Sequence, residues 1–481
     1  MELERIPKKT ATEMQVIVYG SVYYFSMLAE SILRKKWFRS DSFWVSRVLY
    51  RDPLRRIPLF FDTQVLLKSQ YWPRERLDAL TLVRLHDIVR RVSRMPYWNA
   101  RFRAARLGAD FGLKDFAHVP ILTKRDFLAG GMKCLDQKLL PKSHRDFTSG
   151  STGQPFEFHL DWRAELRYFA IRERMFRNIV GGQKLPVVYF RWRINPGFFS
   201  GRHVLFRLRG YNDIRLRLTA LVELTKKFTR GFVLYGYTSS FVELARQLRA
   251  AGVRLPIKAV VATGESVRAS DRAEVERELD TKMFLTYATW EVKWIGHECE
   301  YHNCHINEEY VYVEIVDESG KPVPNGQEGQ ILVTSFESEA MPFIRYSTGD
   351  RGVVSHDPCR CGRTLQTIRV SGRQSNVIDM PGRFVPLFDV STAFDTFARS
   401  VRQYQIIQSG PLSFTIKIVV THAFEESREN LHRTLQRVLH PNAKIAFEIV
   451  EDIPQAPSGK AVYFLRSFDA EPCDTTEGEL I

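Results

Sequence analysis

The stretch IKAVVATGE, residues 257–265, has the pattern of an apolar β-strand that runs into a glycine turn. Residues 238–252 before it form a helical pattern that ends in glycine, and residues 271–279 after it form a second one. Another strand is expected at residues 282–289. This alternation of strand and helix predicts an α/β sheet that binds its ligands at the carboxyl ends of its strands.

Further along the chain the pattern becomes β-rich and then restarts. Residues 310–317 and 330–336 are strand-like, and a turn is expected between them at residues 324–329. Past residue 373 a compact α+β unit is predicted, which is large enough to be a domain. Its expected elements are helices at 388–400 and 425–439 and strands at 403–408, 413–420 and 444–451.

Residues 40–120 are helical in pattern, most clearly at residues 74–95, and another helix is expected at residues 160–180, followed by a strand at residues 184–192. These patterns divide the chain into four parts: a helical amino-terminal region at 1–115, an α/β core with a β-rich subdomain at 116–372, an α+β carboxyl-terminal domain at 373–466, and an acidic tail at 467–481 that is predicted to be disordered.

The composition is that of a globular protein with an excess of positive charge. Of 481 residues, 70 are Lys or Arg and 55 are Asp or Glu, for a net charge of +15. This balance favours anionic partners such as a nucleotide, CoA, acidic lipid or nucleic acid, although a basic solvated surface explains it equally well. The 6 cysteines are too few for a secreted disulfide scaffold of this length.

An uncharged apolar stretch, Met14 to Ala29, lies near the amino terminus. It is shorter than the roughly 20 residues that a membrane-spanning helix needs. A buried core helix is the plainer interpretation. The alternative is a helix at a membrane surface, in which residues 14–36 supply aromatic and basic anchors. We expect a cytoplasmic protein, on the inner face of the membrane if this contact forms.

The stretch DFTSGSTGQPFEF, residues 146–158, is rich in glycine and small hydroxyl residues. Its glycines permit left-handed turns, in which successive backbone N–H groups form a nest for an anion. No basic residue follows Gly153, so the stretch is not a P-loop. Alone it is a weak signal, and an ordinary loop is the plainer interpretation. Its candidate donors are Thr148, Ser149, Gly150, Ser151, Thr152 and Gly153.

Six motifs follow one another along the chain: TSGSTGQP (148–155), TGES (263–266), YATWEV (287–292), IRYSTGDRG (344–352), SGRQSNVIDMPGRFVP (371–386) and PQAPSGKAV (454–462). Six motifs in order give a more specific signal than any one of them. Together they resemble the adenylate-forming superfamily of acyl-CoA synthetases, and most closely its phenylacetate-CoA ligase-like branch, which includes CapK-type enzymes. The resemblance covers roughly residues 115–465.

The resemblance implies a nucleotide site assembled from most of these motifs. The glycine-rich stretch Thr148 to Gly153 is expected to hold the β- and γ-phosphates of ATP. Gly264, Glu265 and Ser266 would line the adenine pocket, and Tyr287 would stack on the base.

The same resemblance implies the catalytic charges. Glu291 is expected to hold Mg²⁺, and Asp350 would accept hydrogen bonds from the ribose hydroxyls with Arg373 nearby. Lys460, on a mobile carboxyl-terminal domain, would contact the carboxylate and the α-phosphate. Mg²⁺ and Lys460 would offset negative charge in the transition state, because attack of a carboxylate on a phosphate brings two anions together.

The sequence departs from the family pattern around Tyr287. The family often has Gly after this tyrosine and Ser or Thr before the glutamate, where this chain has Ala288 and Trp290. A tryptophan has no hydroxyl to offer Mg²⁺ or phosphate, and Thr289 is a candidate substitute. The hinge between the domains is expected at Ser375.

Cysteine and histidine residues supply a second signal. CEYHNCH (299–305) and CRC (359–361) flank the β-rich part, and soft thiolates with imidazole suit tetrahedral zinc. Similarly placed Cys and His groups in the phenylacetate-CoA ligase-like branch favour His305 over Cys304, with His302 and His297 as further substitutes. A filled set leaves no open position, so the zinc would be structural; reduced buried thiols without metal are the alternative. The preferred ligands are Cys299, His305, Cys359 and Cys361.

The acid pocket is expected beside the YATWEV strand. Aromatic walls suit an aromatic or other planar acid, but the same residues could equally be core packing. The candidates are Tyr235, Gly236, Tyr237, Trp290, Trp294 and Ile295.

We therefore expect an ATP- and Mg²⁺-dependent enzyme that adenylates a carboxylic acid and passes the acyl group to CoA. Transfer to an amine, giving an amide, is the alternative among enzymes. A zinc-stapled nucleic-acid-binding protein is the non-enzyme alternative, but no basic stripe with interleaved aromatics is present, so nucleic acid is not expected. A membrane-tethered scaffold without catalysis is a third hypothesis. The sequence also allows a homodimer.

Overall fold

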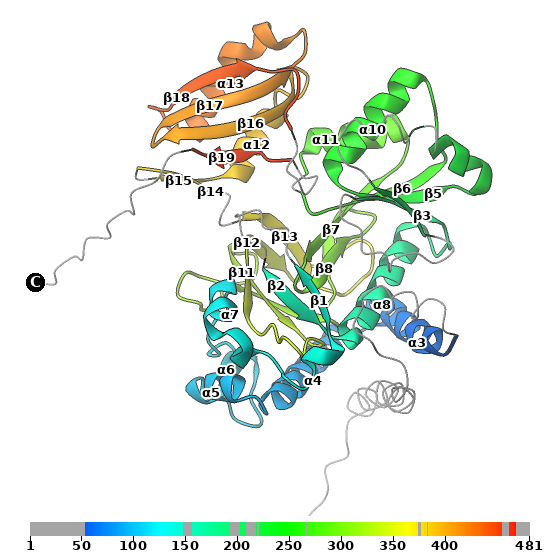
Figure 1. Ribbon diagram of the computed structural model, residues 1–481, viewed down its shortest axis with the longest axis vertical. Coiled ribbons are helices and arrows are strands. Elements are labelled where there is room, and N and C mark those ends of the chain that lie inside the picture. The colour runs from blue at the N-terminus through cyan, green and yellow to red at the C-terminus, as the bar shows by residue number, and fades with distance from the viewer. Residues whose placement is uncertain are drawn as a thin grey trace, which may run out of the picture.

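The computed structural model describes residues 53–147, 156–191, 203–207, 218, 221–265, 267–373, 377–381, 383–454 and 461–467. Figure 1 shows a large body built around one long sheet and a smaller carboxyl-terminal domain beside it. The α/β class with a separate α+β domain is therefore confirmed. The apolar stretch Met14 to Ala29 lies outside the described residues.

Eleven strands form the main sheet, in the order β10-β11-β12-β13-β9-β8-β7-β6-β5-β3-β4. Strands β4, β3, β5, β6 and β7 run parallel, and every pairing from β7 through β8 and onward is antiparallel. The expected β-rich part is therefore continuous with the α/β sheet and does not form a sheet of its own. The strands are β3 (Val187–Arg191), β4 (His203–Arg207), β5 (Phe232–Gly236), β6 (Ile257–Thr263), β7 (Met283–Thr289), β8 (Lys293–Glu298), β9 (Cys304–Ile306), β10 (Val311–Val316), β11 (Gly329–Ser335), β12 (Tyr346–Ser355) and β13 (Thr367–Arg373).

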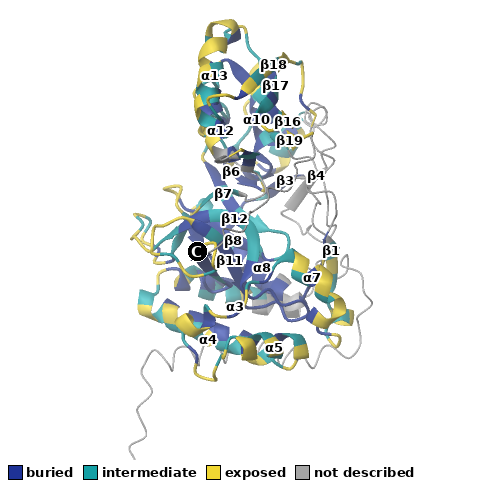
Figure 2. Cartoon of the chain, turned by 90° about the vertical axis from the view of Figure 1, so that its left-hand side faces the viewer, coloured by how far each residue is buried: buried dark blue, intermediate teal, exposed yellow. Residues whose placement is uncertain are grey.

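Both faces of the parallel half are buried, which explains its apolar runs. In β6, Ala259 and Val261 belong to one core cluster and Val260 and Ala262 to another. Successive residues of a strand point to opposite faces, so a strand that is covered on both faces needs apolar residues throughout. Figure 2 shows this continuous burial through the centre of the molecule.

Helices cover the two faces of the sheet (Figure 1). Helix α10 begins right after β5 and ends at Gly252, whose φ of +63° closes the helix in the left-handed region as expected. Helices α3 and α8 pack together beneath the sheet. The helices of the large body are α3 (Pro53–Ser69), α4 (Arg74–Val92), α5 (Pro96–Ala104), α6 (Leu113–Phe116), α7 (Lys124–Gly130), α8 (Trp162–Ile179), α10 (Thr238–Ala251) and α11 (Ala269–Leu279), with 3₁₀ turns at Gly131–Cys134 and Leu140–Lys142.

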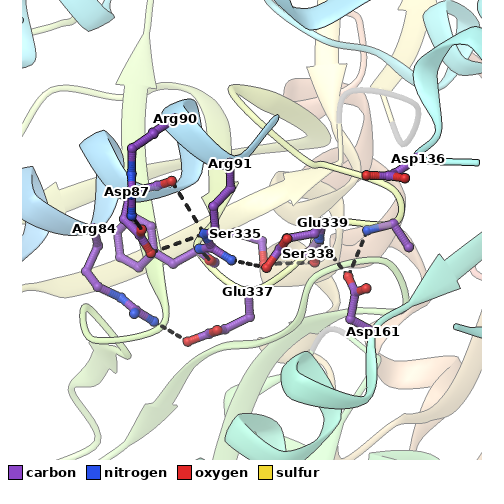
Figure 3. A network of polar contacts seen from close by, with 12 residues as sticks. Arg84, Asp87, Arg90, Arg91, Asp136, Asp161, Ser335, Glu337, Ser338 and Glu339 are labelled. Carbon is purple, nitrogen blue, oxygen red and sulfur yellow. Dashed lines mark hydrogen bonds and ion pairs between the residues drawn. The ribbon is translucent and has the colours of Figure 1, made fainter. Parts of the chain in front are cut away.

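A network of buried charges fixes helix α4 to the loop between β11 and β12 (Figure 3). Arg84 pairs with Glu337, and Arg91 pairs with Glu339. Asp161 accepts a hydrogen bond of 2.6 Å from the backbone N–H of Glu339. Because this loop leads into β12, the network fixes the point at which that strand begins.

A two-stranded hairpin frames the glycine-rich stretch. Strands β1 (His144–Phe147) and β2 (Glu157–Leu160) are antiparallel, and Phe147 pairs with Glu157. Of the residues that connect them, 148–155 lie outside the described part of the chain, and Phe156 is buried.

The carboxyl-terminal domain has its own sheet, in the order β18-β17-β16-β19, and its own core. Phe394, Ile416 and Leu431 are among its buried residues. The helices and strands expected past residue 373 are all found, within a few residues at each end. The boundaries at residues 115 and 372 remain predictions. The elements are β14 (Val377–Met380), β15 (Arg383–Pro386), α12 (Leu387–Asp395), β16 (Val401–Gly410), β17 (Ser413–Val420), α13 (Phe424–Val438), β18 (Lys444–Ile449) and β19 (Phe464–Arg466).

Candidate active site

Tyr287 and Asp350 are in contact, although their strands are far apart in sequence and are not adjacent in the sheet. The hydroxyl of Tyr287 on β7 donates a hydrogen bond of 2.8 Å to Asp350 Oδ2 on β12. It also lies 3.2 Å from Thr348 Oγ1. Asp350 is the backbone partner of Arg373 on β13. Three of the residues expected to bind the nucleoside are therefore neighbours, together with Thr348, which the sequence did not single out.

Glu291 lies in the turn that connects β7 to β8, and it is half-buried. The hydroxyl of Tyr346 on β12 donates a hydrogen bond of 3.2 Å to Glu291 Oε1. Thr289 Oγ1 accepts a 3.0 Å hydrogen bond from the backbone N–H of Val292, which closes the turn. Thr289 therefore stabilises the backbone of the turn. The sequence analysis did not identify Tyr346 as a partner of Glu291, although Tyr346 lies within the motif IRYSTGDRG.

Glu265 lies at the carboxyl end of β6, after Gly264, whose φ is +73°. Its carboxylate accepts hydrogen bonds of 3.0 Å from both the backbone N–H and the hydroxyl of Ser239, in the first turn of α10. It also accepts one of 3.1 Å from the backbone N–H of Ala461. The segment of the carboxyl-terminal domain that follows Lys460 therefore lies against the predicted adenine strand.

A second contact joins the two domains near the same strand. Asp395 at the end of α12 accepts a 2.8 Å hydrogen bond from the hydroxyl of Ser270 and a 3.3 Å one from the backbone N–H of Ala269. The guanidinium of Arg268 lies 5.8 Å from the ring centroid of Tyr404. These contacts hold the small domain over the amino-terminal end of α11.

Several predicted site residues cannot be placed relative to these groups. Ser266, the expected hinge Ser375 and the expected catalytic Lys460 lie outside the described residues. So do the six expected phosphate donors: Thr148, Ser149, Gly150, Ser151, Thr152 and Gly153.

Most residues expected in the acid pocket are packed in the core. Tyr235 and Trp294 stack with ring centroids 6.0 Å apart, and both are buried. A Cβ atom on Gly236 would lie 2.6 Å from the carbonyl oxygen of Phe190, so glycine is needed for close packing of β5 on β3. Of the six expected wall residues, Trp290 alone is half-buried. The others are buried: Tyr235, Gly236, Tyr237, Trp294 and Ile295.

The four preferred cysteine and histidine ligands converge on one point. Their ligand atoms all lie within 4.8 Å of one another: Cys299, His305, Cys359 and Cys361. The two sulfur atoms of Cys299 and Cys359 are 3.7 Å apart. Tetrahedral ligands at the Zn–S distance of about 2.3 Å would be separated by about 3.8 Å, so this spacing fits a metal and is far too long for a disulfide. The substitutes His297, His302 and Cys304 are not in this set.

The partners of these groups also suit a metal. His305 Nδ1 lies 2.9 Å from the carbonyl oxygen of Leu365, which leaves Nε2, 3.2 Å from Cys361 Sγ, facing the cluster. Burial lowers the pKa of His305 to about 4, so its ring is neutral near pH 7. Burial raises the pKa of the Cys299 thiol to about 12, so a bound cation would have to displace its proton. The cluster joins β9, which carries His305, to the connection that follows β8 and to the connection between β12 and β13.

The chain is similar in sequence to a known family model and to several known proteins. The family model "CapK C-terminal domain" matches residues 377–467. Phenylacetate-coenzyme A ligase of Thermus thermophilus is 27% identical over 361 residues, which cover 70% of this chain and 79% of the relative. Protein CapK of Staphylococcus aureus is 22% identical, with 73% of this chain and 80% of the relative covered. These matches support the expected resemblance to the phenylacetate-CoA ligase-like and CapK-type branch of the adenylate-forming superfamily.

A solved structure agrees with the fold of this branch. The crystal structure of 2-hydroxyisobutyryl-CoA ligase in the postadenylation state matches with a TM-score of 0.70 at 18% identity, covering 83% of this chain and 93% of that chain. The adenylate-forming fold of this chain therefore includes both the large body and the carboxyl-terminal domain. Within its described part, every helix is too short or too polar to traverse a lipid bilayer.

Proposed function

We propose that this protein activates a carboxylic acid with ATP to an acyl-adenylate, releases pyrophosphate, and transfers the acyl group to CoA as a thioester. One observation carries the proposal. Tyr287 on β7 bonds to Asp350 on β12, and Glu291 in the β7–β8 turn bonds to Tyr346 on β12, in a chain that spans 79% of a protein named phenylacetate-coenzyme A ligase. Relatives of that name join a carboxylic acid to CoA.

The protein groups have distinct tasks in this reaction. Asp350 accepts hydrogen bonds from the ribose and Tyr287 packs on the adenine, so that the α-phosphate is held near Glu291. Glu291 would hold Mg²⁺, which offsets negative charge on the phosphates when it is bound. Lys460 adds a second cation from the other domain, and the hydrogen bond between Ala461 and Glu265 supports its approach to the nucleotide.

The cysteine and histidine cluster completes the proposal with a structural zinc. The four residues would supply all the ligands of a tetrahedral zinc and would leave no position for water. The metal would therefore stabilise the contact between β9 and β13 and would take no part in the reaction. One zinc per chain in purified protein is the expected result. A chain that folds fully without metal would contradict this assignment.

The acid is proposed to enter beside Trp290, because the other predicted wall residues are packed in the core. A single half-buried indole at the β7–β8 turn favours a small planar or aromatic acid that can stack on it. Acids that differ only in replacing a phenyl ring by a cyclohexyl ring of similar size provide the matched comparison. The aromatic member should give the higher kcat/KM.

Pyrophosphate release is the direct test. The protein is incubated with ATP, Mg²⁺ and a panel of carboxylic acids, with CoA or an amine as acceptor, and the products are identified by mass spectrometry. Release with at least one acid, followed by an acyl-CoA product, is expected. An amide in place of the thioester would redirect the second half-reaction, and no release with any acid would overturn the proposal.

A further inference from the structure

Asp395, the last residue of helix α12, has an unfavourable place in its own helix. The carbonyl groups at the carboxyl end of a helix carry partial negative charge, so an acidic residue there is repelled. The sequence of α12, LFDVSTAFD, contains no basic residue that would offset this charge. A conflict between a local preference and the observed structure points to a contact outside the helix.

Helix α11, in the large body, begins without a cap from its own N-cap residue. That residue is Arg268, whose side chain makes no capping hydrogen bond. The Nε and Nη2 atoms of Arg268 instead donate to the two carboxylate oxygens of Asp271, at 2.8 and 2.6 Å. The backbone N–H groups in the first turn of a helix have no acceptor within the helix. An acceptor for this turn therefore has to come from elsewhere.

Asp395 supplies that acceptor across the domain boundary, where α12 lies close to α11 (Figure 1). Its carboxylate accepts a hydrogen bond of 3.3 Å from the backbone N–H of Ala269, the first residue of α11. It accepts a second one, of 2.8 Å, from the hydroxyl of Ser270. A carboxylate at the amino end of a helix faces partial positive charge. The same side chain is thus unfavourable for the helix that carries it and favourable for the helix that it caps.

A second contact between the domains depends on the same docking. The backbone N–H of Ala461, the neighbour of Lys460, donates a hydrogen bond of 3.1 Å to Glu265. Glu265 and the first turn of α11 both follow β6 in the large body. The carboxyl-terminal domain has a core of its own and is expected to move as one body. Fixing this domain at Asp395 therefore also keeps Ala461 against Glu265.

We propose that Asp395 is a positioning residue. It caps helix α11 from the other domain and thereby holds the carboxyl-terminal domain where the segment next to Lys460 meets the predicted adenine strand. The cap forms only while the two domains are docked, so its free energy favours this one orientation. The consequence for catalysis rests on the proposed function, in which Lys460 acts on the acyl-adenylate from the docked domain.

Amide hydrogen exchange of the full-length protein, resolved to single residues, tests the docking without a substrate. In Asp395→Ala, the Ala461 amide should exchange about fivefold faster than in the parent, the factor expected for the loss of one helix cap. Asp395→Asn keeps a side-chain acceptor and should stay within about twofold of the parent. Glu429→Ala, at an exposed acid on α13, is the control. The amide of Ile416, which is buried in β17, reports whether the small domain itself stays folded.

The exchange rates give clear outcomes. An unchanged rate at Ala461 in Asp395→Ala overturns the inference. Equal acceleration at Ala461 and Ile416 overturns it too, because Asp395 would then support only its own domain. Ser270→Ala should accelerate Ala461 by a smaller factor and should add nothing in the double variant with Asp395→Ala, since both changes remove one contact. Additive effects would contradict this contact.

The two half-reactions separate the inference from the proposed function. With an acid that supports pyrophosphate release, Asp395→Ala should slow acyl-adenylate formation about fivefold. Thioester formation from supplied acyl-adenylate and CoA should stay within about twofold of the parent. Equal slowing of both half-reactions would overturn the positioning role. A parent protein that releases no pyrophosphate with any acid would instead refute the proposed function, and the exchange at Ala461 would still decide whether Asp395 docks the domain.

Discussion

Two kinds of polar cluster occur in this protein, and they differ in how completely their groups satisfy one another. The first kind, which we call the framework, consists of the buried pairs Arg84–Glu337 and Arg91–Glu339 and of the cysteine and histidine ligands, which face a single point. Around the candidate site, Tyr287, Glu291 and Lys293 are half-buried.

The contacts of the site are also more replaceable than those of the framework. Glu291 accepts a hydrogen bond of 3.2 Å from Tyr346, and the ion pair between Lys293 and Asp146 is 3.8 Å long. A ligand can replace such contacts at little cost, whereas a buried pair that loses one member leaves a charge without compensation. Stability should therefore depend on the framework clusters, and nucleotide and metal dependence on the site.

The largest effect on stability is expected at Glu337. Its carboxylate is 1% exposed and faces both Arg84 and Arg167. Glu337→Gln should lower the free energy of unfolding by about 3–5 kcal/mol, because two buried guanidinium groups lose their shared anion. Denaturant titration measures the change. Glu318→Gln, in an exposed pair with Arg351, should lower the free energy of unfolding by less than about 1 kcal/mol. Equal losses in the two variants would show that the buried pair does not contribute more to stability than the exposed one.

Loss of the metal should rank next. Cys361→Ser should reduce bound zinc from about one per chain to nearly none and destabilise the fold by about 4 kcal/mol, the linkage expected for a ligand present at a thousand times its dissociation constant. Zinc analysis and thermal unfolding provide the measurements. Cys304→Ala changes a neighbouring thiol outside the set and should keep the metal. Retention of zinc by Cys361→Ser would show that the cluster is not the metal site.

Glu291→Gln should leave the fold intact and impair the reaction. Removal of one charged group that acts on the transition state costs about 10²–10³ in rate. Pyrophosphate release at saturating ATP should fall by that factor while the unfolding midpoint changes little. Glu318→Gln serves again as the control. A variant that unfolds as readily as Glu337→Gln would place Glu291 in the framework instead.

The smallest effect is expected at Tyr346, which positions Glu291 through its hydroxyl. Tyr346→Phe removes one hydrogen bond from a hydroxyl to the Glu291 carboxylate, worth about 1.5 kcal/mol, and should raise the Mg²⁺ concentration for half-maximal pyrophosphate release about tenfold. The rate at saturating Mg²⁺ should stay within twofold of the parent. A lower saturated rate with unchanged Mg²⁺ dependence would refute this role. Tyr301→Phe, at a half-exposed tyrosine, is the control.

The sequence predicted elements better than it predicted contacts. The helix at α10 and the strand at β6 carry strong local signals, namely helical periodicity ending at Gly252 and an unbroken apolar run. Strand β9 has only three residues, Cys304–Ile306, and no such pattern, so the fusion of the β-rich part with the parallel sheet was not foreseen. Tyr235 and Trp294 are aromatic whether they line a pocket or a core, and residue type alone does not distinguish the two.

By itself, the sequence predicted the α/β class and a cluster of Cys and His residues, because both depend on residue type and local periodicity. The resemblance to the adenylate-forming superfamily supplied the roles of the six motifs and the choice of His305 as a ligand. Only the tertiary structure decided that Tyr346 contacts Glu291 and that Lys293 lies between Trp290 and Phe158. Phe158 and Lys293 are far apart along the chain, and their meeting depends on how the β1–β2 hairpin packs against the main sheet. Such long-range contacts arise from packing, which no local pattern encodes.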